Sequence, residues 1–195
     1  YVVDLGIDQV ITYTLDGVNG RLNVVPPPYF VNTKAGAGPR HFVFHPSGKF
    51  TYLIEELSGA VSVYSAAKSP YLELVQNISS HPADYKGAIA SADIHISPDG
   101  KFLYASNRGE SNSLAIFKID ETTGKLTPIG HQPTLGKKPR NFNFDPSGNF
   151  LLVANQESDE IVIFKRDLIT GLLTDTGKRV TVGKPVCIQW LTEIK

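Results

Sequence analysis

The chain has 195 residues, 41% of them hydrophobic, with 19 basic residues balanced by 19 acidic ones. This length can bury one sizeable core, and a neutral chain without a basic run gives no reason to expect nucleic acid or a membrane surface as a partner. No apolar stretch reaches the roughly 18 residues that a membrane-spanning helix needs. The start YVVDLGIDQV lacks a signal-peptide pattern, and the single cysteine, Cys187, excludes an internal disulfide, so we expect a cytoplasmic location.

Three similar turns recur along the chain at intervals of about fifty residues. Each combines a proline, which restricts φ, with a glycine that accepts positive φ, as tight hairpin turns require. Each turn is followed by a phenylalanine and a β-rich strand, and two later turns contain Thr-Gly, at Thr123-Gly124 and Thr170-Gly171. The three turns are His45-Pro46-Ser47-Gly48, Ser97-Pro98-Asp99-Gly100 and Asp145-Pro146-Ser147-Gly148.

The segment before each turn alternates between apolar and polar residues, which predicts a strand with one buried face. Its apolar positions are Phe42 and Phe44, Ile94 and Ile96, and Phe142 and Phe144, and residues 185–190 resemble a further copy. Four-stranded units of this length are typical of β-propeller blades. The register predicts an all-β single domain with a partial blade at 1–35, blades at about 36–86, 87–135 and 136–182, and a lone strand at 183–195.

Two ring sizes agree with this register. The last strand could complete the first blade and close a ring of four, or the chain could be part of a larger ring. The sequence contains no methionine, even at position 1, which favours a fragment of a larger ring.

Function is expected at polar residues that occupy equivalent positions in the blades, because these positions converge at one mouth of the ring. After the second strand the blades have Glu55-Glu56, Asn107-Arg108 and Asn155-Gln156, and before the turn they have Arg40-His41, Ala92-Asp93 and Arg140-Asn141, with His95 in the middle blade.

Clustered guanidiniums would bind a carboxylate or phosphate and would stabilise an oxyanion at a carbonyl, while Glu56 or a histidine could move a proton. Structural alternatives remain for each group: Arg40 and Arg140 as struts between blades, the two asparagines as loop caps, and Asp93 as a hydrogen-bond acceptor. The histidines and Cys187 lack metal-ligand spacing, so neither a metal nor another cofactor is expected.

Six segments together resemble the lactonases with a seven-bladed β-propeller, a family that includes 6-phosphogluconolactonases and fungal carboxymuconate lactonizing enzymes. The resemblance implies that about four of seven blades are present, as the C-terminal half of the ring. It also implies hydrolysis of 6-phosphogluconolactone to 6-phosphogluconate in the pentose phosphate pathway. The segments are Gly36–His41, Glu56-Leu57, Ala92–His95, Ser106–Gly109, Pro139–Phe142 and Ala154–Gln156.

Carried over to this chain, the family pattern implies Glu56, Arg40 and Arg108 as catalytic residues. The family's histidine would lie before Tyr1, and Glu55 stands where related sequences tend to have Asn, adding a negative charge beside Glu56. Equivalent blade positions add a predicted substrate-binding set of His41, His95, Asn107, Arg140, Asn155 and Gln156.

Two other functions stay open at this point. One is a hydrolase for another carboxylated lactone or a muconate-type lactonizing enzyme, and the other is a non-catalytic propeller that serves as a binding scaffold. The expected partner is a small anionic sugar lactone, with neither nucleic acid nor membrane. The uncovered blade faces of a partial ring would also favour association between chains.

Overall fold

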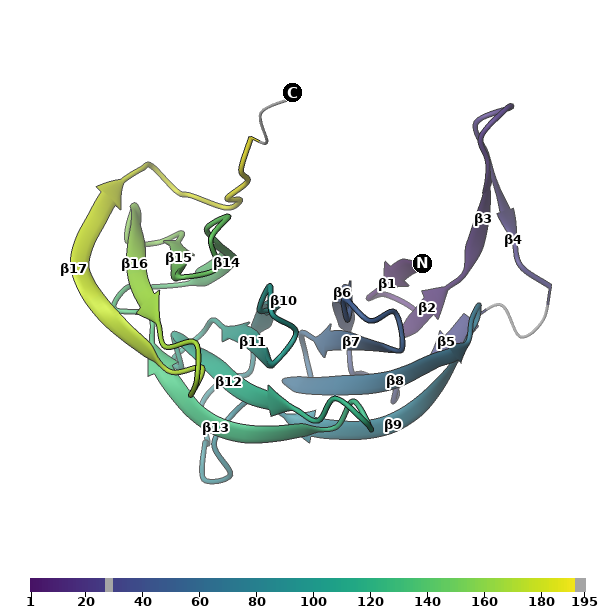
Figure 1. Ribbon diagram of the computed structural model, residues 1–195, viewed down its shortest axis with the longest axis horizontal. Helices are drawn as coiled ribbons and strands as arrows, with labels where there is room; N and C mark the ends of the chain where they lie inside the picture. The colour runs from purple at the N-terminus through teal and green to yellow at the C-terminus, as the bar shows by residue number, and fades with distance from the viewer. Residues whose placement is uncertain (27–29, 192–195) are drawn as a thin grey trace.

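The computed structural model describes residues 1–26 and 30–191. Every regular element in these residues is a β-strand, and they contain no helix long and apolar enough to cross a membrane. The strands form a series of separate sheets that follow one another along the chain in an arc (Figure 1). The fold is therefore all-β, as the alternating sequence pattern predicts.

Three of the sheets have four antiparallel strands each, and each strand pairs with the next one along the chain. The first sheet contains β6 (Pro39–Phe44), β7 (Phe50–Glu55), β8 (Ala60–Lys68) and β9 (Tyr71–Ser79). The second contains β10 (Ser91–Ile96), β11 (Phe102–Asn107), β12 (Ser113–Ile119) and β13 (Leu126–Pro133). The third contains β14 (Pro139–Phe144), β15 (Phe150–Asn155), β16 (Glu160–Arg166) and β17 (Leu173–Thr181).

The N-terminal part forms a smaller unit. A three-stranded sheet joins β1 (Val2–Asp4), β2 (Gln9–Ile11) and β5 (Phe30–Asn32), and a separate hairpin joins β3 (Tyr13–Asp16) to β4 (Arg21–Val24). The hairpin projects away from the arc in Figure 1.

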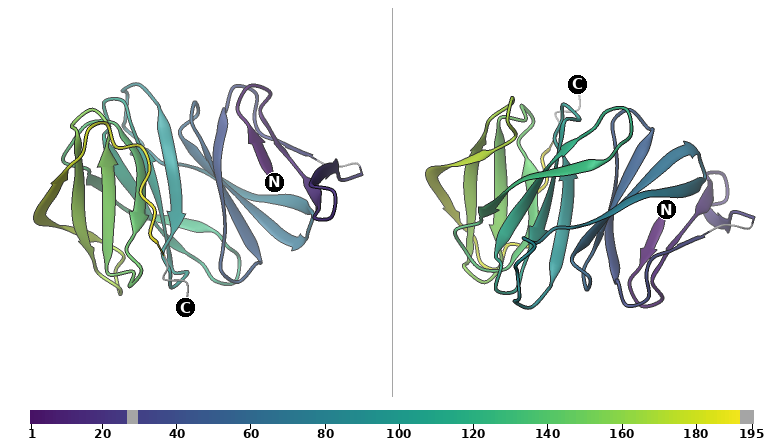
Figure 2. Two further views of the ribbon diagram at one scale, coloured as in Figure 1. Left: turned by 90° about the horizontal axis from the view of Figure 1, so that it is seen from above. Right: turned by 90° about the horizontal axis from the view of Figure 1, so that it is seen from below.

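The sheets are arranged like the blades of a propeller. Their first strands β6, β10 and β14 line the concave side of the arc, and their last strands β9, β13 and β17 lie on the outside (Figure 1). The side views show adjacent sheets packed face to face (Figure 2). One apolar cluster fills the space between the first and second four-stranded sheets, and another fills the space between the second and third. Burial between blades therefore holds the arc together.

Tyrosine hydroxyls tie neighbouring blades at equivalent positions. Tyr52 donates to the Gly124 carbonyl of the next blade at 3.0 Å, and Tyr104 donates to the Gly171 carbonyl at 2.5 Å. Gly124 has a φ of 71°, and a Cβ there would lie 2.5 Å from the Phe50 ring. The Thr-Gly turns therefore need glycine both for their backbone conformation and for close contact with the preceding blade.

The predicted lone strand at 183–195 is not seen as a strand. Residues 183–191 have no β-ladder pairing, and residues 192–195 lie outside the described part of the chain. The segment instead lies beside β14 through side chains: the Ile188 amide donates to Asn141, Asn143 donates to the Ile188 carbonyl, and the Trp190 indole donates to the Phe144 carbonyl. In the three four-stranded sheets, the first strand forms its β-ladder with the second strand of the same sheet. The side-chain contacts of residues 183–191 with β14 do not replace such a ladder.

Candidate active site

Each first strand has a β-bulge at the same point. In β6, Pro39 pairs with Glu55 and His41 with Ile54, so Arg40 is the extra residue. The register of β14 shifts in the same way around Arg140, and that of β10 shifts between Ser91 and Ile94. A bulge turns a side chain out of the regular alternation. The side chains of Arg40, Asp93 and Arg140 therefore depart from the regular up-and-down alternation of their strands.

Arg40, Glu56 and Arg108 form one ion-pair cluster. The Nε of Arg40 lies 2.8 Å from Oε2 of Glu56, and Nη2 of Arg108 lies 2.7 Å from Oε1 of the same carboxylate. Glu56 directly follows β7, and Arg108 directly follows β11, so the carboxylate joins two blades. The predicted catalytic residues are therefore in direct contact.

Backbone carbonyls complete the support of both guanidiniums. Arg40 donates to the Ala92 carbonyl at 2.6 Å, and Arg108 donates to the carbonyls of Ala90 and Ser91. Burial and then the positive charge of Arg108 lower the pKa of Arg40, while the charge of Glu56 opposes this shift. Both guanidiniums stay charged because arginine does not deprotonate in proteins.

A groove of about 390 Å³ lies along the first strands next to this cluster. Its polar wall carries Arg40, His41, Asp93 and His95, and Tyr1 and Val3 of the N-terminal unit also line it. The structure therefore brings two of the predicted binding residues, His41 and His95, to the same groove as Arg40.

Asp93 connects three adjacent first strands. Its Oδ1 accepts from Nδ1 of His41 on β6 at 2.6 Å, and its Oδ2 accepts from Nε2 of His95 on β10 at 3.1 Å. The same Oδ2 accepts from the Asn141 amide group at 2.6 Å and from the Phe142 amide on β14 at 3.2 Å. Burial would raise the pKa of Asp93, but the hydrogen bonds and charges of the two histidines outweigh burial and hold the pKa well below its usual value.

The Arg140 side chain has no hydrogen bond or ion pair within residues 1–26 and 30–191, and the residue is partly exposed. Its positive charge contributes to lowering the pKa of Arg40, so the two guanidiniums repel each other electrostatically. The Gln156 side-chain oxygen is buried and has no hydrogen-bond partner in the described part of the chain. The three positive charges of the arginines exceed the two negative charges of Glu56 and Asp93. This region would therefore attract an anion.

Asn107 and Asn155, which the sequence predicts to bind substrate, do not line the groove. Both are fully buried, and their side-chain amides donate to carbonyls of the links between blades, Asn107 to Ser80 at 2.8 Å and Asn155 to Thr134 at 3.0 Å. An amide that satisfies a buried carbonyl is a structural group. Their positions support the alternative of loop caps.

Glu55 also differs from its expected place beside Glu56. Its carboxylate accepts from Ser58 at 2.6 Å and from Ser62 at 2.7 Å, inside its own blade. It occupies the position of Asn107 and Asn155, but an ionised carboxylate cannot donate to a linker carbonyl. The carboxylate of Glu55 therefore lies at a second cavity, of about 480 Å³, which Glu55 lines together with Thr33 and Asn77.

Sequence reasoning missed the central place of Asp93, which it took for a simple structural acceptor. The signal was the spacing of Asp93 and His95, because residues two apart on a strand share one face. The contribution of Tyr1 and Val3 to the groove had no signal in the sequence, since it depends on how two blades pack.

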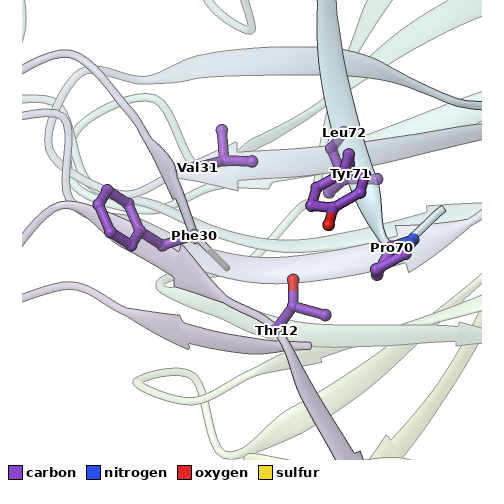
Figure 3. Close-up of a pocket in the computed structure, with 6 residues that line it drawn as sticks. All are labelled: Thr12, Phe30, Val31, Pro70, Tyr71 and Leu72. Carbon is purple, nitrogen blue, oxygen red and sulfur yellow. The ribbon is translucent and has the colours of Figure 1, made fainter. Parts of the chain in front are cut away.

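Another cavity, of about 210 Å³, lies between the N-terminal unit and the turn that joins β8 to β9 (Figure 3). It contains none of the predicted site residues; its wall is Thr12, Phe30, Val31, Pro70, Tyr71 and Leu72. Within residues 1–26 and 30–191 there is also no group of three or more His, Cys, Asp or Glu side chains that could hold a metal ion. The groove beside Arg40 is therefore the best candidate active site.

Comparison with known proteins agrees with the blade geometry. The family described as "Lactonase, 7-bladed beta-propeller" matches residues 1–190. The chain belongs to this family. The predicted fold class, a β-propeller of four-stranded antiparallel blades that is only partly present, is thereby confirmed.

Several relatives of the chain are named 6-phosphogluconolactonase. The protein from Formosa agariphila is 50% identical over 157 residues, which is 80% of this chain and 44% of that protein. The protein from Pectobacterium carotovorum is 44% identical over 151 residues, covering 77% of this chain and 44% of that protein. The chain thus spans less than half the length of these lactonase relatives.

A solved structure shows the same likeness in three dimensions. It is the periplasmic gluconolactonase of Pseudomonas aeruginosa, with a TM-score of 0.92 and 37% sequence identity. The match covers 97% of this chain and 53% of that protein. The arc of this chain therefore superimposes on about half of that protein's chain.

Proposed function

We propose that the full-length protein carrying this chain hydrolyses 6-phosphogluconolactone to 6-phosphogluconate, a step of the pentose phosphate pathway. The observation that carries the proposal is the Arg40–Glu56–Arg108 cluster beside a groove that also holds His41 and His95. The names of the relatives from Formosa agariphila and Pectobacterium carotovorum support the same substrate.

The guanidiniums suit the two anionic features of such a reaction. Hydrolysis of a lactone builds negative charge on the carbonyl oxygen, and a fixed, half-buried cation such as Arg40 stabilises that charge more effectively than water does. Arg140, which has no anion partner among the described residues, is the proposed anchor for the phosphate, which guanidinium binds through two parallel hydrogen bonds.

Glu56 is proposed to position the two arginines. Each of its carboxylate oxygens accepts from a different guanidinium, at 2.8 and 2.7 Å. Because guanidinium N–H groups already engage both oxygens, Glu56 is proposed as a positioning residue and not as the base.

The direct test compares 6-phosphogluconolactone with unphosphorylated gluconolactone, with spontaneous hydrolysis subtracted. We expect the wild type to hydrolyse the phosphorylated lactone faster. Arg140→Ala should lower kcat/KM for that substrate by about 10- to 100-fold, the equivalent of a lost charge-assisted contact, and should change the rate on the other lactone much less. An equal effect on both substrates would argue against Arg140 as the phosphate anchor.

Two other outcomes of the assay would redirect the proposal. Faster hydrolysis of gluconolactone would favour the activity named for the Pseudomonas aeruginosa protein, and turnover only of other carboxylated lactones would favour a lactonizing-type enzyme. No turnover of any lactone would favour a binding scaffold. A cytoplasmic location remains a prediction, since that relative is named periplasmic.

A further inference from the structure

We infer that His95 is the general base that activates water for attack on the lactone, and that Asp93 is the positioning residue that orients it. The inference deepens the proposed function and depends on it. Three groups in or beside the groove could accept a proton: Glu56 beside it, and His41 and His95 in its wall.

The hydrogen bonds of His41 leave it no free nitrogen. Asp93 can only accept when ionised, so Nδ1 of His41, at 2.6 Å from Oδ1, must carry the proton. Its other nitrogen, Nε2, lies 2.9 Å from Nη1 of Arg40, which can only donate. Nη1 also lies 3.4 Å from Nδ1, so the guanidinium covers the ring edge that carries both nitrogens.

The hydrogen bonds of His95, in contrast, leave one of its ring nitrogens without a partner among the described residues. Its Nε2 lies 3.1 Å from Oδ2 of Asp93, so the proton of the neutral ring belongs on Nε2. The lone pair is then on Nδ1, for which the described part of the chain offers no hydrogen-bond partner. The side chain is 27% exposed and lines the groove, so water can reach it.

The ring of His95 is also held in place. The Phe142 ring of the next blade packs edge-on against it, with centroids 4.9 Å apart. Asp93 is itself fixed, because its amide donates to Ser106 and its carboxylate accepts from Asn141 and the Phe142 amide. Such support sets the tautomer and the direction of the ring, as a carboxylate does for histidine in catalytic triads.

Nδ1 of His95 takes a proton from water while the water oxygen bonds to the lactone carbonyl carbon, and the carbonyl oxygen becomes an oxyanion beside Arg40. The intermediate collapses by breaking the bond between that carbon and the ring oxygen. The imidazolium gives its proton to the departing ring oxygen, and the new carboxylic acid loses its own proton to solvent.

The test uses the full-length protein and 6-phosphogluconolactone. We expect His95→Ala to lower kcat by about 100-fold or more, the usual contribution of a general base, with little change in KM. Added imidazole should restore part of this loss, because it can occupy the space of the ring. Wild-type kcat/KM should fall toward acid pH, where a general base is protonated, and this limb should disappear in His95→Gln.

Two further variants separate catalysis from folding. Asp93→Asn should lower kcat, and imidazole should not rescue it because His95 is still present but misoriented. His45→Gln is the matched control: His45 binds the Gly100 carbonyl at the opposite end of β6, so this variant should keep the wild-type kcat and pH limb. The charged groups around His95 that bear on the profile are Asp93, Arg40 and His41. Thermal unfolding of each variant checks that it folds.

The outcomes are distinct. If the wild type hydrolyses the lactone and folded His95→Ala and His95→Gln keep its kcat and pH profile, the inference is wrong while the proposed function stands. Loss of the pH limb in His41→Gln, with His95→Gln normal, would also overturn it by moving the base to His41. A wild type without lactone hydrolysis would overturn the proposed function and this inference together.

Discussion

At the scale of the residue, Asp93 is the side chain on which most of the site depends. It is 3% exposed and joins strands of three blades through hydrogen bonds. A buried carboxylate is stable only when its charge is compensated, and His41, His95 and Asn141 provide that compensation. One residue therefore supports both the orientation of the groove and the packing of its strands.

The depressed pKa of Asp93 makes stability depend on pH. Because the pKa is lower in the folded state, the ionised group stabilises the fold fully above its unfolded value of about 3.9, and this stabilisation is lost as the pH falls through the folded value. We expect Asp93→Asn to be less stable than the wild type at pH 7. The difference in their free energies of unfolding should shrink as the pH falls below about 4.

Urea unfolding of the full-length protein at several pH values measures this difference. Asp175→Asn is the control, because Asp175 is a surface partner of Arg179 and should affect stability little at any pH. A difference between wild type and Asp93→Asn that stays constant down to acid pH would show that the Asp93 charge does not stabilise the fold.

At the scale of the element, the links between blades depend on buried amides. Asn107 donates to the Ser80 carbonyl and accepts from the hydroxyls of Ser80 and Ser91, so it ties the end of β11 to the link that precedes β10. Asn155 repeats the contact one blade further on, with Thr134. The same position thus carries a structural amide in two blades and a carboxylate, Glu55, in a third.

Replacing this amide should destabilise the link. In Asn107→Asp, the ionised carboxylate cannot donate to the Ser80 carbonyl, and two buried acceptors would face each other. We expect a loss of about 1–3 kcal/mol in the free energy of unfolding, the cost of an unsatisfied buried group. Urea unfolding measures it, with Asn23→Asp on the exposed strand β4 as the control. Equal stability of the two variants would contradict a structural role for Asn107.

At the scale of the whole molecule, the arc leaves apolar side chains in solvent. The hairpin β3–β4 presents Leu15, which is 70% exposed, directly opposite Leu22, which is 60% exposed. On the far side of the arc, Ile169 is 89% exposed. Apolar surface of this kind favours association.

The 195 residues expressed alone should therefore associate with one another. Sedimentation velocity is expected to show larger species as concentration rises, and Leu15→Lys with Leu22→Lys should reduce them, because charge on an exposed strand opposes pairing. Thr14→Lys with Asn23→Lys is the matched control, since that pair lies on the other face of the same hairpin. A monomer at all concentrations would rule out these surfaces as sites of association.

Much of the fold could be predicted from the pattern of residues. The Pro-x-Gly turns, the alternating first strands and the Thr-Gly turns are local signals, because turn chemistry and side-chain periodicity act over a few residues. Arg40, Glu56 and Arg108 were also predicted, since equivalent positions in repeated blades must meet at one mouth.

The tertiary structure alone decided how those side chains are used. Asp93 became the centre of the groove because its hydrogen bonds reach His41 and Asn141, 52 and 48 residues away in the sequence. Asn107 and Asn155 turned to the links between blades, and Glu55 turned to serines of its own blade. The segment at 183–191 kept its strand-like sequence but made no ladder, because a ladder needs a partner strand. Local sequence determined the repeated unit, and contacts between units determined the chemistry of the groove.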